Sequence, residues 1–143
     1  MPNRNRIVQI LTIFILIALV FGLCLPIPIK VRANPGIIYV RSTATGANDG
    51  TSWEDAYTDL QDALAFAVSG DEIWVAAGTY KPSLTGDRYA TFQLLTDIAV
   101  YGGFPSEGGL WESRDWEANE TTLSGDIGVI DDIADNSYHV VSI

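Results

Sequence analysis

The stretch "GDEIWVAAGTY", residues 70–80, places the apolar run Ile73–Ala77 between two glycines. Five apolar residues are too few to cross a membrane, which takes about 20. A surface strand would alternate apolar and polar residues, and this run does not. The stretch therefore predicts a short strand inside the core of a folded protein.

Similar hexamers return at a constant interval. "IWVAAG" begins at Ile73, "IAVYGG" at Ile98 and "LSGDIG" at Leu123, so the two intervals are equal. A short strand, a glycine turn and a repeat of about 20 to 50 residues are typical of a solenoid of stacked coils. The third hexamer is polar in its middle, and we expect it on a different face. The hexamers close on Gly78, Gly103 and Gly128.

A β-solenoid explains why such short strands are so apolar. Each coil's strand is paired by its neighbours on both sides, and its inward side chains stack into the core. The chain must then bend sharply into the next face. We expect Gly78 and Gly103 to allow these bends, through a positive φ or a close approach of two backbones.

A helix is predicted ahead of the first coil, from Thr58 to Ser69. Thr58 and Gln61 have capping-box spacing, and Gly70 stands where a left-handed residue would end the helix. We interpret the helix as an N-terminal cap over the open end of the stack. A small βαβ unit built from 37–40, the helix and 72–76 fits these segments equally well. The apolar stripe of the helix is Leu60, Ala63, Leu64 and Ala67.

Residues 1–33 have the pattern of a secretory signal peptide. Arg4 and Arg6 precede an uncharged apolar stretch, and "VRA" at 31–33 offers a cleavage site after Ala33. The alternative is a retained membrane anchor, because the apolar segment from 7 to 25 is close to the length of about 20 residues that spans a bilayer. We expect an exported protein, extracellular or on the cell surface, that contacts a membrane only if this leader is kept.

The chain after Ala33 is strongly acidic. All 18 acidic residues lie there with four basic ones, which gives this part of the chain a formal net charge of −14. Such a surface repels phosphate backbones, so the charge argues against nucleic-acid binding. The only cysteine is Cys24 in the leader, so no disulfide is available to the rest. A chain of this length makes at most one domain.

Four segments together resemble a known family. They are "GANDGTSWEDAYTDLQDALAFAVSGDEIWVAAGTYKP" (46–82), "AVYGGF" (99–104), "RDWEANETTLSGDI" (114–127) and "DNSYHVVSI" (135–143). In their order they resemble the start of secreted right-handed parallel β-helix proteins of the pectate-lyase-like superfamily, including bacterial surface proteins with β-helix repeats. The resemblance covers about 42–143.

The resemblance implies an all-β fold, a right-handed parallel β-helix. Residues 34–70 would form the N-terminal strand, loop and capping helix, and residues 71–143 the first, incomplete coils. Members usually carry more coils, and the chain ends inside the apolar strand "HVVSI". We therefore expect a truncated stack whose uncovered last strand promotes edge-to-edge self-association.

The resemblance does not fix an activity. Lyases and glycosidases of the superfamily use residues on middle coils, so no catalytic position is carried over to this chain. His139, the only histidine, opens an apolar strand and is expected to be structural.

Two sets of residues are candidates for binding. Oxygen ligands in "GDIGVIDDIADN" are the kind that Ca²⁺ prefers, although their spacing does not match an EF-hand loop. A solvated acidic loop is the alternative, and no other cofactor is expected. Trp111 and Trp116 are candidates for stacking on sugar rings, with packing over a core edge as the alternative. The acidic residues are Asp126, Asp131, Asp132 and Asp135.

Three functions follow as hypotheses. The first is a non-catalytic exported scaffold for adhesion or display, with polysaccharide or cell-surface components as partners. The second is the start of a polysaccharide lyase or glycoside hydrolase whose active site lies on later coils. The third is a carbohydrate-binding module that uses Trp111 and Trp116.

Overall fold

The structure, a computed structural model, describes residues 35–143, whose regular elements are mostly short strands, with one α-helix. The predicted signal peptide and its cleavage site lie outside the described residues. Among residues 35–143, no helix has the length and hydropathy that a bilayer-spanning helix needs. The elements in chain order are β1 (Ile37–Val40), α2 (Leu60–Phe66), β2 (Glu72–Ala76), β3 (Gly78–Tyr80), β4 (Phe92–Gln93), β5 (Ala99–Phe104), the 3₁₀ helix η1 (Trp111–Ser113), β6 (Thr121–Leu123) and β7 (Val141–Ser142).

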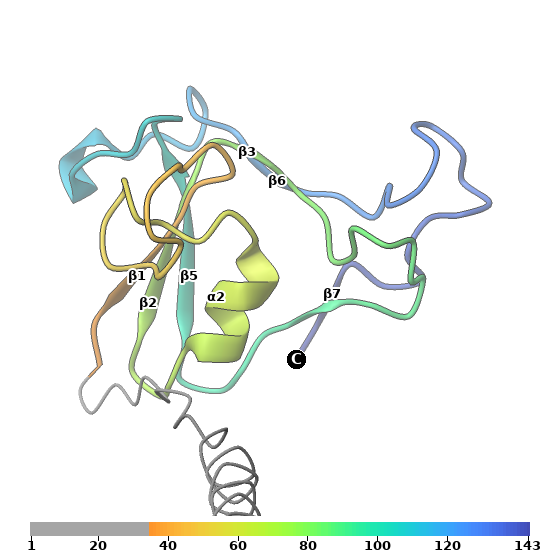
Figure 1. The fold of residues 1–143 in the computed structure, drawn as a ribbon, viewed down its shortest axis with the longest axis horizontal. Helices are drawn as coiled ribbons and strands as arrows, with labels where there is room; N and C mark the ends of the chain where they lie inside the picture. Colours follow the sequence, from red (N-terminus) through yellow and green to blue (C-terminus); the bar gives the residue numbers. More distant parts are fainter. Residues whose placement is uncertain (1–34) are drawn as a thin grey trace, which may run out of the picture. The chain divides into compact units, whose positions relative to one another are not determined.

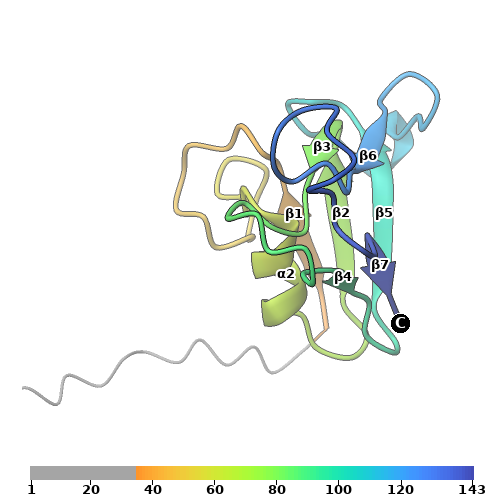
Figure 2. The same ribbon diagram turned by 90° about the vertical axis from the view of Figure 1, so that its right-hand side faces the viewer.

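The strands form three small sheets, and every pairing in them is parallel. β1, β2 and β5 make a three-stranded sheet in that order, β3 pairs with β6, and β4 pairs with β7. Three consecutive strands, β2 to β4, are thus matched one by one by the next three, β5 to β7. We call these two sets the first turn and the second turn. Figure 2 shows β1 and α2 on one side, then the first turn, then the second turn.

The helix α2 lies on one face of the three-stranded sheet and contacts β1, β2 and β4 (Figure 1). Its apolar stripe of Leu60, Ala63, Leu64 and Ala67 is buried, as the periodicity predicts. The stripe packs against inward residues of the strands, including Ile38, Val40, Ile73, Val75 and Phe92. This contact between helix and strands is the centre of the core.

The predicted helix boundaries and caps are wrong. The helix begins at Leu60, and the side chain of Asp59 caps it by accepting a 2.9 Å hydrogen bond from the Gln61 N–H. Thr58 instead donates from its N–H to Asn48 Oδ1 at 2.8 Å. Asp59 rather than Thr58 is the N-cap, because a carboxylate caps a helix at least as well as a hydroxyl and Asp59 stands directly before the apolar stripe.

The helix also ends earlier than Ser69. Its last residue is Phe66, and Ala67 is the C-cap with an extended conformation. Gly70 has the expected positive φ, +90°, but it serves the turn that enters β2, where its N–H donates to Asp97 O at 2.8 Å. The sequence therefore predicts the left-handed conformation of Gly70 correctly, but Gly70 does not end the helix as expected.

The equal spacing of the hexamers does not describe the pairing. Ile73 lies opposite Val100 rather than opposite Ile98, and Ala76 lies opposite Phe104 after an extra residue in β5. The shift from Ile98 to Val100 keeps the same side chains facing inward, because strand faces alternate with period two. Gly103, with φ +88°, lies inside this irregularity rather than after the strand.

The third hexamer is not an apolar strand. β6 covers only Thr121–Leu123, and it pairs with β3 rather than with β5, which matches the expectation of a different face. His139 is exposed and precedes β7 rather than belonging to it. The βαβ unit of β1, α2 and β2 is also present, and β5 extends its sheet.

Candidate functional site

A row of aromatic side chains crosses the three-stranded sheet. Tyr39, Trp74 and Tyr101 lie opposite one another in register on β1, β2 and β5. The rings of Tyr39 and Trp74 meet edge to face with centroids 5.9 Å apart. They are outside the main core, because the neighbouring inward positions carry Ile38, Ile73 and Val75.

One side chain from a loop and one from the end of β5 cover this row. Trp53 contacts Tyr39 with ring centroids 4.9 Å apart and anchors its indole by donating to Gly109 O at 2.9 Å. Phe104, which is fully buried, stacks on Trp74 at 4.8 Å and 15°. The aromatic row is therefore mostly a second, outer core rather than a free binding face.

Trp111 closes the same cluster, and this is packing over a core edge. Its ring lies 5.3 Å from Trp74 and 4.9 Å from Tyr101, and the Arg114 guanidinium sits 5.3 Å from its centroid. The side chain still keeps 41% of its surface exposed. A sugar that stacked on Trp111 would have to compete with Arg114 for the ring.

Trp116 is placed differently. It is 70% exposed, and among residues 35–143 it has no aromatic contact with Trp111. Both tryptophans belong to the loop 105–120, together with the exposed side chain of Leu110. Of the two sequence candidates for carbohydrate stacking, Trp116 is the one with a free ring.

The acidic candidates bind the backbone of their own loop. Asp135 accepts a 2.7 Å hydrogen bond from the Val129 N–H, and Asp132 accepts one of 2.9 Å from Ala134. Asp126 accepts a longer contact of 3.4 Å from the Asp131 N–H. By accepting these hydrogen bonds, the side chains stabilise the turns of residues 126–135.

These acids do not form a complete calcium site in the part of the chain that the structure describes. No group of three or more His, Cys, Asp or Glu side chains there is arranged to hold a metal ion. Asp126 and Asp135 each keep one buried oxygen without a hydrogen-bond partner. Two such oxygens are fewer than the six to eight ligands that Ca²⁺ takes.

A second aromatic pair was not predicted from the sequence. Tyr89 and Tyr138, from the loops 81–91 and 124–140, have ring centroids 5.1 Å apart, and the Arg88 guanidinium lies 4.3 Å from the Tyr138 centroid. Tyr89 is 83% exposed. The two tyrosines are far apart in the sequence, so no local signal would bring them together.

Asp71 is a structural residue that sequence reasoning also missed. Its carboxylate is buried and accepts hydrogen bonds from the Gly36 N–H at 2.7 Å and the Val68 N–H at 2.9 Å. Its carbonyl accepts from the Ala99 N–H at 3.1 Å. It thereby ties the starts of β1, β2 and β5 to the end of α2.

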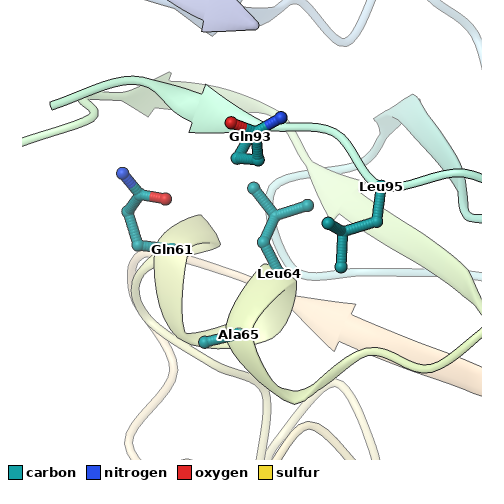
Figure 3. Close-up of a pocket in the computed structure, with 5 residues that line it drawn as sticks. All are labelled: Gln61, Leu64, Ala65, Gln93 and Leu95. Carbon is teal, nitrogen blue, oxygen red and sulfur yellow. The ribbon is translucent and has the colours of Figure 1, made fainter. Parts of the chain in front are cut away.

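The helix α2 leaves a small pocket against the first turn (Figure 3). The pocket has a volume of about 250 Å³ and is lined by Gln61, Leu64, Ala65, Gln93 and Leu95. Its polar groups are engaged: the Gln61 amide donates to Pro82 O and Thr91 O, and Gln93 accepts from the Ser142 hydroxyl. The pocket is a gap in packing with an apolar wall.

Two side chains have pKa values that are shifted from their ordinary values. Burial raises the pKa of Tyr80, whose hydroxyl donates to Ala76 O at 3.0 Å. A hydrogen bond from Ser106 lowers the pKa of the exposed Glu107. Both are explained by local structure.

No family model matches the chain, and neither the curated proteins nor the solved structures contain a match to it.

Proposed function

We propose that the protein is an exported scaffold whose folded part is the capped start of a right-handed parallel β-helix, used for adhesion or display. The observation that carries the proposal is the strand-by-strand parallel match of the second turn to the first, in three separate sheets. In a β-helix each turn pairs with the next in this way.

The role of the polar side chains supports a scaffold rather than a reaction centre. Asp71 and Gln61 hold elements of the fold together, and Asp132 and Asp135 stabilise turns. The apolar and aromatic residues form two cores on opposite faces of one sheet. Adhesion and display require a repeating surface that keeps a constant shape.

Export and catalysis are tested on the same sample. The full-length protein, including any coils that follow residue 143, is expressed in a bacterial host, and the exported protein is analysed by intact mass. We expect a product that begins at Asn34 and that releases no unsaturated oligosaccharides from pectin or alginate. A rise in ultraviolet absorbance in that assay would favour the alternative, a polysaccharide lyase, and a retained leader would favour a membrane anchor.

The glycoside hydrolase alternative predicts new reducing ends from a neutral or acidic polysaccharide. The same exported protein is incubated with such polymers, and reducing sugar is measured over time. The scaffold proposal expects none, and steady release would replace it by the hydrolase.

Carbohydrate binding is a second candidate, because Trp116 presents a free ring on an exposed loop. If the protein is a carbohydrate-binding module, Trp116→Ala should weaken retention on a polysaccharide gel. Leu110→Ala is the matched control, since Leu110 is 75% exposed in the same loop but has no ring. Equal retention of both variants and the parent protein would remove this candidate.

A further inference from the structure

Two tyrosines from different turns meet at the surface. Tyr89 lies in the loop between β3 and β4 of the first turn, and Tyr138 lies in the loop between β6 and β7 of the second turn. The two loops lie side by side (Figure 1). The ring centroids are 5.1 Å apart, near the short end of the range of about 4.5–7 Å for aromatic pairs. Within residues 35–143, Tyr89 is 83% exposed and Tyr138 52%.

Hydrogen bonds between the two loops hold the pair in place. The Tyr138 N–H donates to Arg88 O at 2.9 Å, and Arg88 Nε donates to Asn136 O at 2.8 Å. The Arg88 guanidinium also lies 4.3 Å from the Tyr138 ring centroid. Directly after the two loops, β4 pairs with β7. All of these contacts lie within residues 88–142, so the geometry of the pair needs no segment outside the described residues.

The composition of the chain directs oxidation to aromatic side chains. After Ala33 the sequence contains no cysteine and no methionine, the side chains that oxidants commonly modify. An exported protein meets an oxidising environment, and this step rests on the export proposed above. Of the aromatic contacts within residues 35–143, that of Tyr89 with Tyr138 alone joins two tyrosines.

We propose that Tyr89 and Tyr138 form a site of oxidative cross-linking, at which a dityrosine bond joins the second turn to the first. The oxidant is hydrogen peroxide, used by a haem peroxidase. One peroxide takes one hydrogen atom from each phenol and is reduced to two waters. The two tyrosyl radicals then couple by a bond between their Cε carbons. The hydrogen on each bonded carbon moves through solvent to the phenol oxygen, so the protein loses two hydrogen atoms in all.

The geometry of the pair suits this reaction. The two ring planes are tilted by 56°, so the rings do not stack face to face and their edge carbons can meet. Arg88 lies over the face of the Tyr138 ring and leaves its edge free for the bond. The Tyr89 phenol is accessible to a peroxidase, because this side chain is the more exposed of the two.

The bond would link the two turns covalently. It closes the long segment from 89 to 138, which includes β4, β5 and β6. Closing such a segment restricts the unfolded chain, as a disulfide does. The part of the chain after Ala33 has no cysteine for a disulfide, so a dityrosine would supply the covalent link that it lacks. The cross-linked protein should therefore unfold at a higher temperature.

The test treats the exported full-length protein with hydrogen peroxide and a haem peroxidase at several low protein concentrations. Dityrosine is followed by its fluorescence, and the linked peptides are identified by mass spectrometry after digestion. Tyr89→Phe and Tyr138→Phe each remove one phenol and keep the ring. Tyr101→Phe is the matched control, because the Tyr101 ring also contacts an aromatic ring, at 4.9 Å, but its partner is Trp111.

We expect a peptide pair that joins Tyr89 to Tyr138 and lacks two hydrogen atoms, with a yield that does not change with protein concentration. It should be lost in Tyr89→Phe and Tyr138→Phe and retained in Tyr101→Phe. Absence of this pair would overturn the proposal, as would dityrosine that forms only between molecules or is equally abundant in Tyr89→Phe and the control. Addition of oxygen to the exposed Trp116 in place of the cross-link would also overturn it.

Thermal unfolding tests the effect of the bond. The midpoint should rise on oxidation of the parent protein and should not rise on oxidation of Tyr89→Phe. An unchanged midpoint in the cross-linked parent would overturn the stabilising role. These assays measure neither cleavage of the leader nor turnover of polysaccharide, so failure of the cross-link and failure of the proposed function are distinguished.

Discussion

The side-chain amide of Gln61 donates a 2.8 Å hydrogen bond to the backbone carbonyl of Pro82. The same nitrogen donates to Thr91 O at 3.0 Å. These carbonyls lie in the connection from β3 to β4, the two strands of the first turn that, unlike β2, have only one partner strand among the described residues. One helical side chain thus supplies donors that a preceding turn of strands would otherwise provide.

Replacing Gln61 tests this cap. Gln61→Ala removes two hydrogen bonds, and we expect the free energy of unfolding to fall by about 1–3 kcal/mol. Gln61→Glu should cost more, because a carboxylate would face two carbonyl oxygens. The measurement is urea denaturation. Gln93→Ala is the control, since its exposed side chain makes one contact, and a loss as large as that of Gln61→Ala would refute the cap.

Asp71 is expected to be the most sensitive polar position in the fold. Asp71→Ala leaves the partly buried N–H groups of Gly36 and Val68 without their carboxylate, so the free energy of unfolding should fall by about 3 kcal/mol or more. Asp87→Ala is the control, because this carboxylate accepts from one exposed N–H, that of Tyr89. Similar values for the two variants would mean that Asp71 does not join the strands and the helix.

A comparison of two glycines with positive φ separates the cost of backbone strain from the cost of a close contact with a neighbouring segment. A Cβ on Gly103 would lie 3.0 Å from backbone atoms of Trp116, whereas a Cβ on Gly86 would meet nothing within 4 Å. Gly86→Ala should therefore cost about 1–2 kcal/mol for its conformation alone. Gly103→Ala should cost about 1–3 kcal/mol more. Equal losses in thermal or urea unfolding would contradict the approach of the loop 105–120 to β5.

The raised pKa of Tyr80 predicts that the free energy of unfolding falls at alkaline pH. Burial raises its pKa above 10.0 in the folded state, so folding favours the neutral phenol. The stabilisation is complete below about pH 10 and is lost as the pH rises through the folded pKa. Tyr80→Phe should therefore lose less stability than the parent protein between about pH 9 and pH 12. A pH profile of Tyr80→Phe that runs parallel to that of the parent protein would contradict this account.

Local patterns predicted the elements better than their pairing. The strands at 37–40 and 72–76 and the buried stripe of α2 follow from short-range periodicity, which depends only on which face is apolar. The glycines with positive φ at Gly70 and Gly103 were also found. The register was missed, with Val100 in place of Ile98 opposite Ile73, because a pattern of period two tolerates that shift.

The candidate sites were harder to predict because they join distant segments. Trp111 was identified, but its packing depends on Trp74 and Phe104, which come from two strands. Asp71 looked like an ordinary polar residue before a strand, although three segments meet at it. The Tyr89–Tyr138 pair depends on two loops stacking, and no local spacing encodes that contact.

The central claim is that the second turn is stacked on the first, and the pairing of β3 with β6 tests it most directly, since a simple βαβ unit does not need it. Thr79 and Thr122 lie opposite each other, and neighbouring strands are about 4.8 Å apart, within disulfide range. Because Cys24 is the only native cysteine, Thr79→Cys with Thr122→Cys gives a clean crosslinking assay in the exported protein.

The control pairs Thr79→Cys with Ser124→Cys, which is displaced along the chain by about 7 Å and so falls outside bonding range. Crosslinking is followed by mass and by mobility on non-reducing gels. The account predicts rapid, nearly complete crosslinking of the Thr79–Thr122 pair and little of the control. Absence of the first crosslink, or equal rates for both pairs, would contradict the stacked turns.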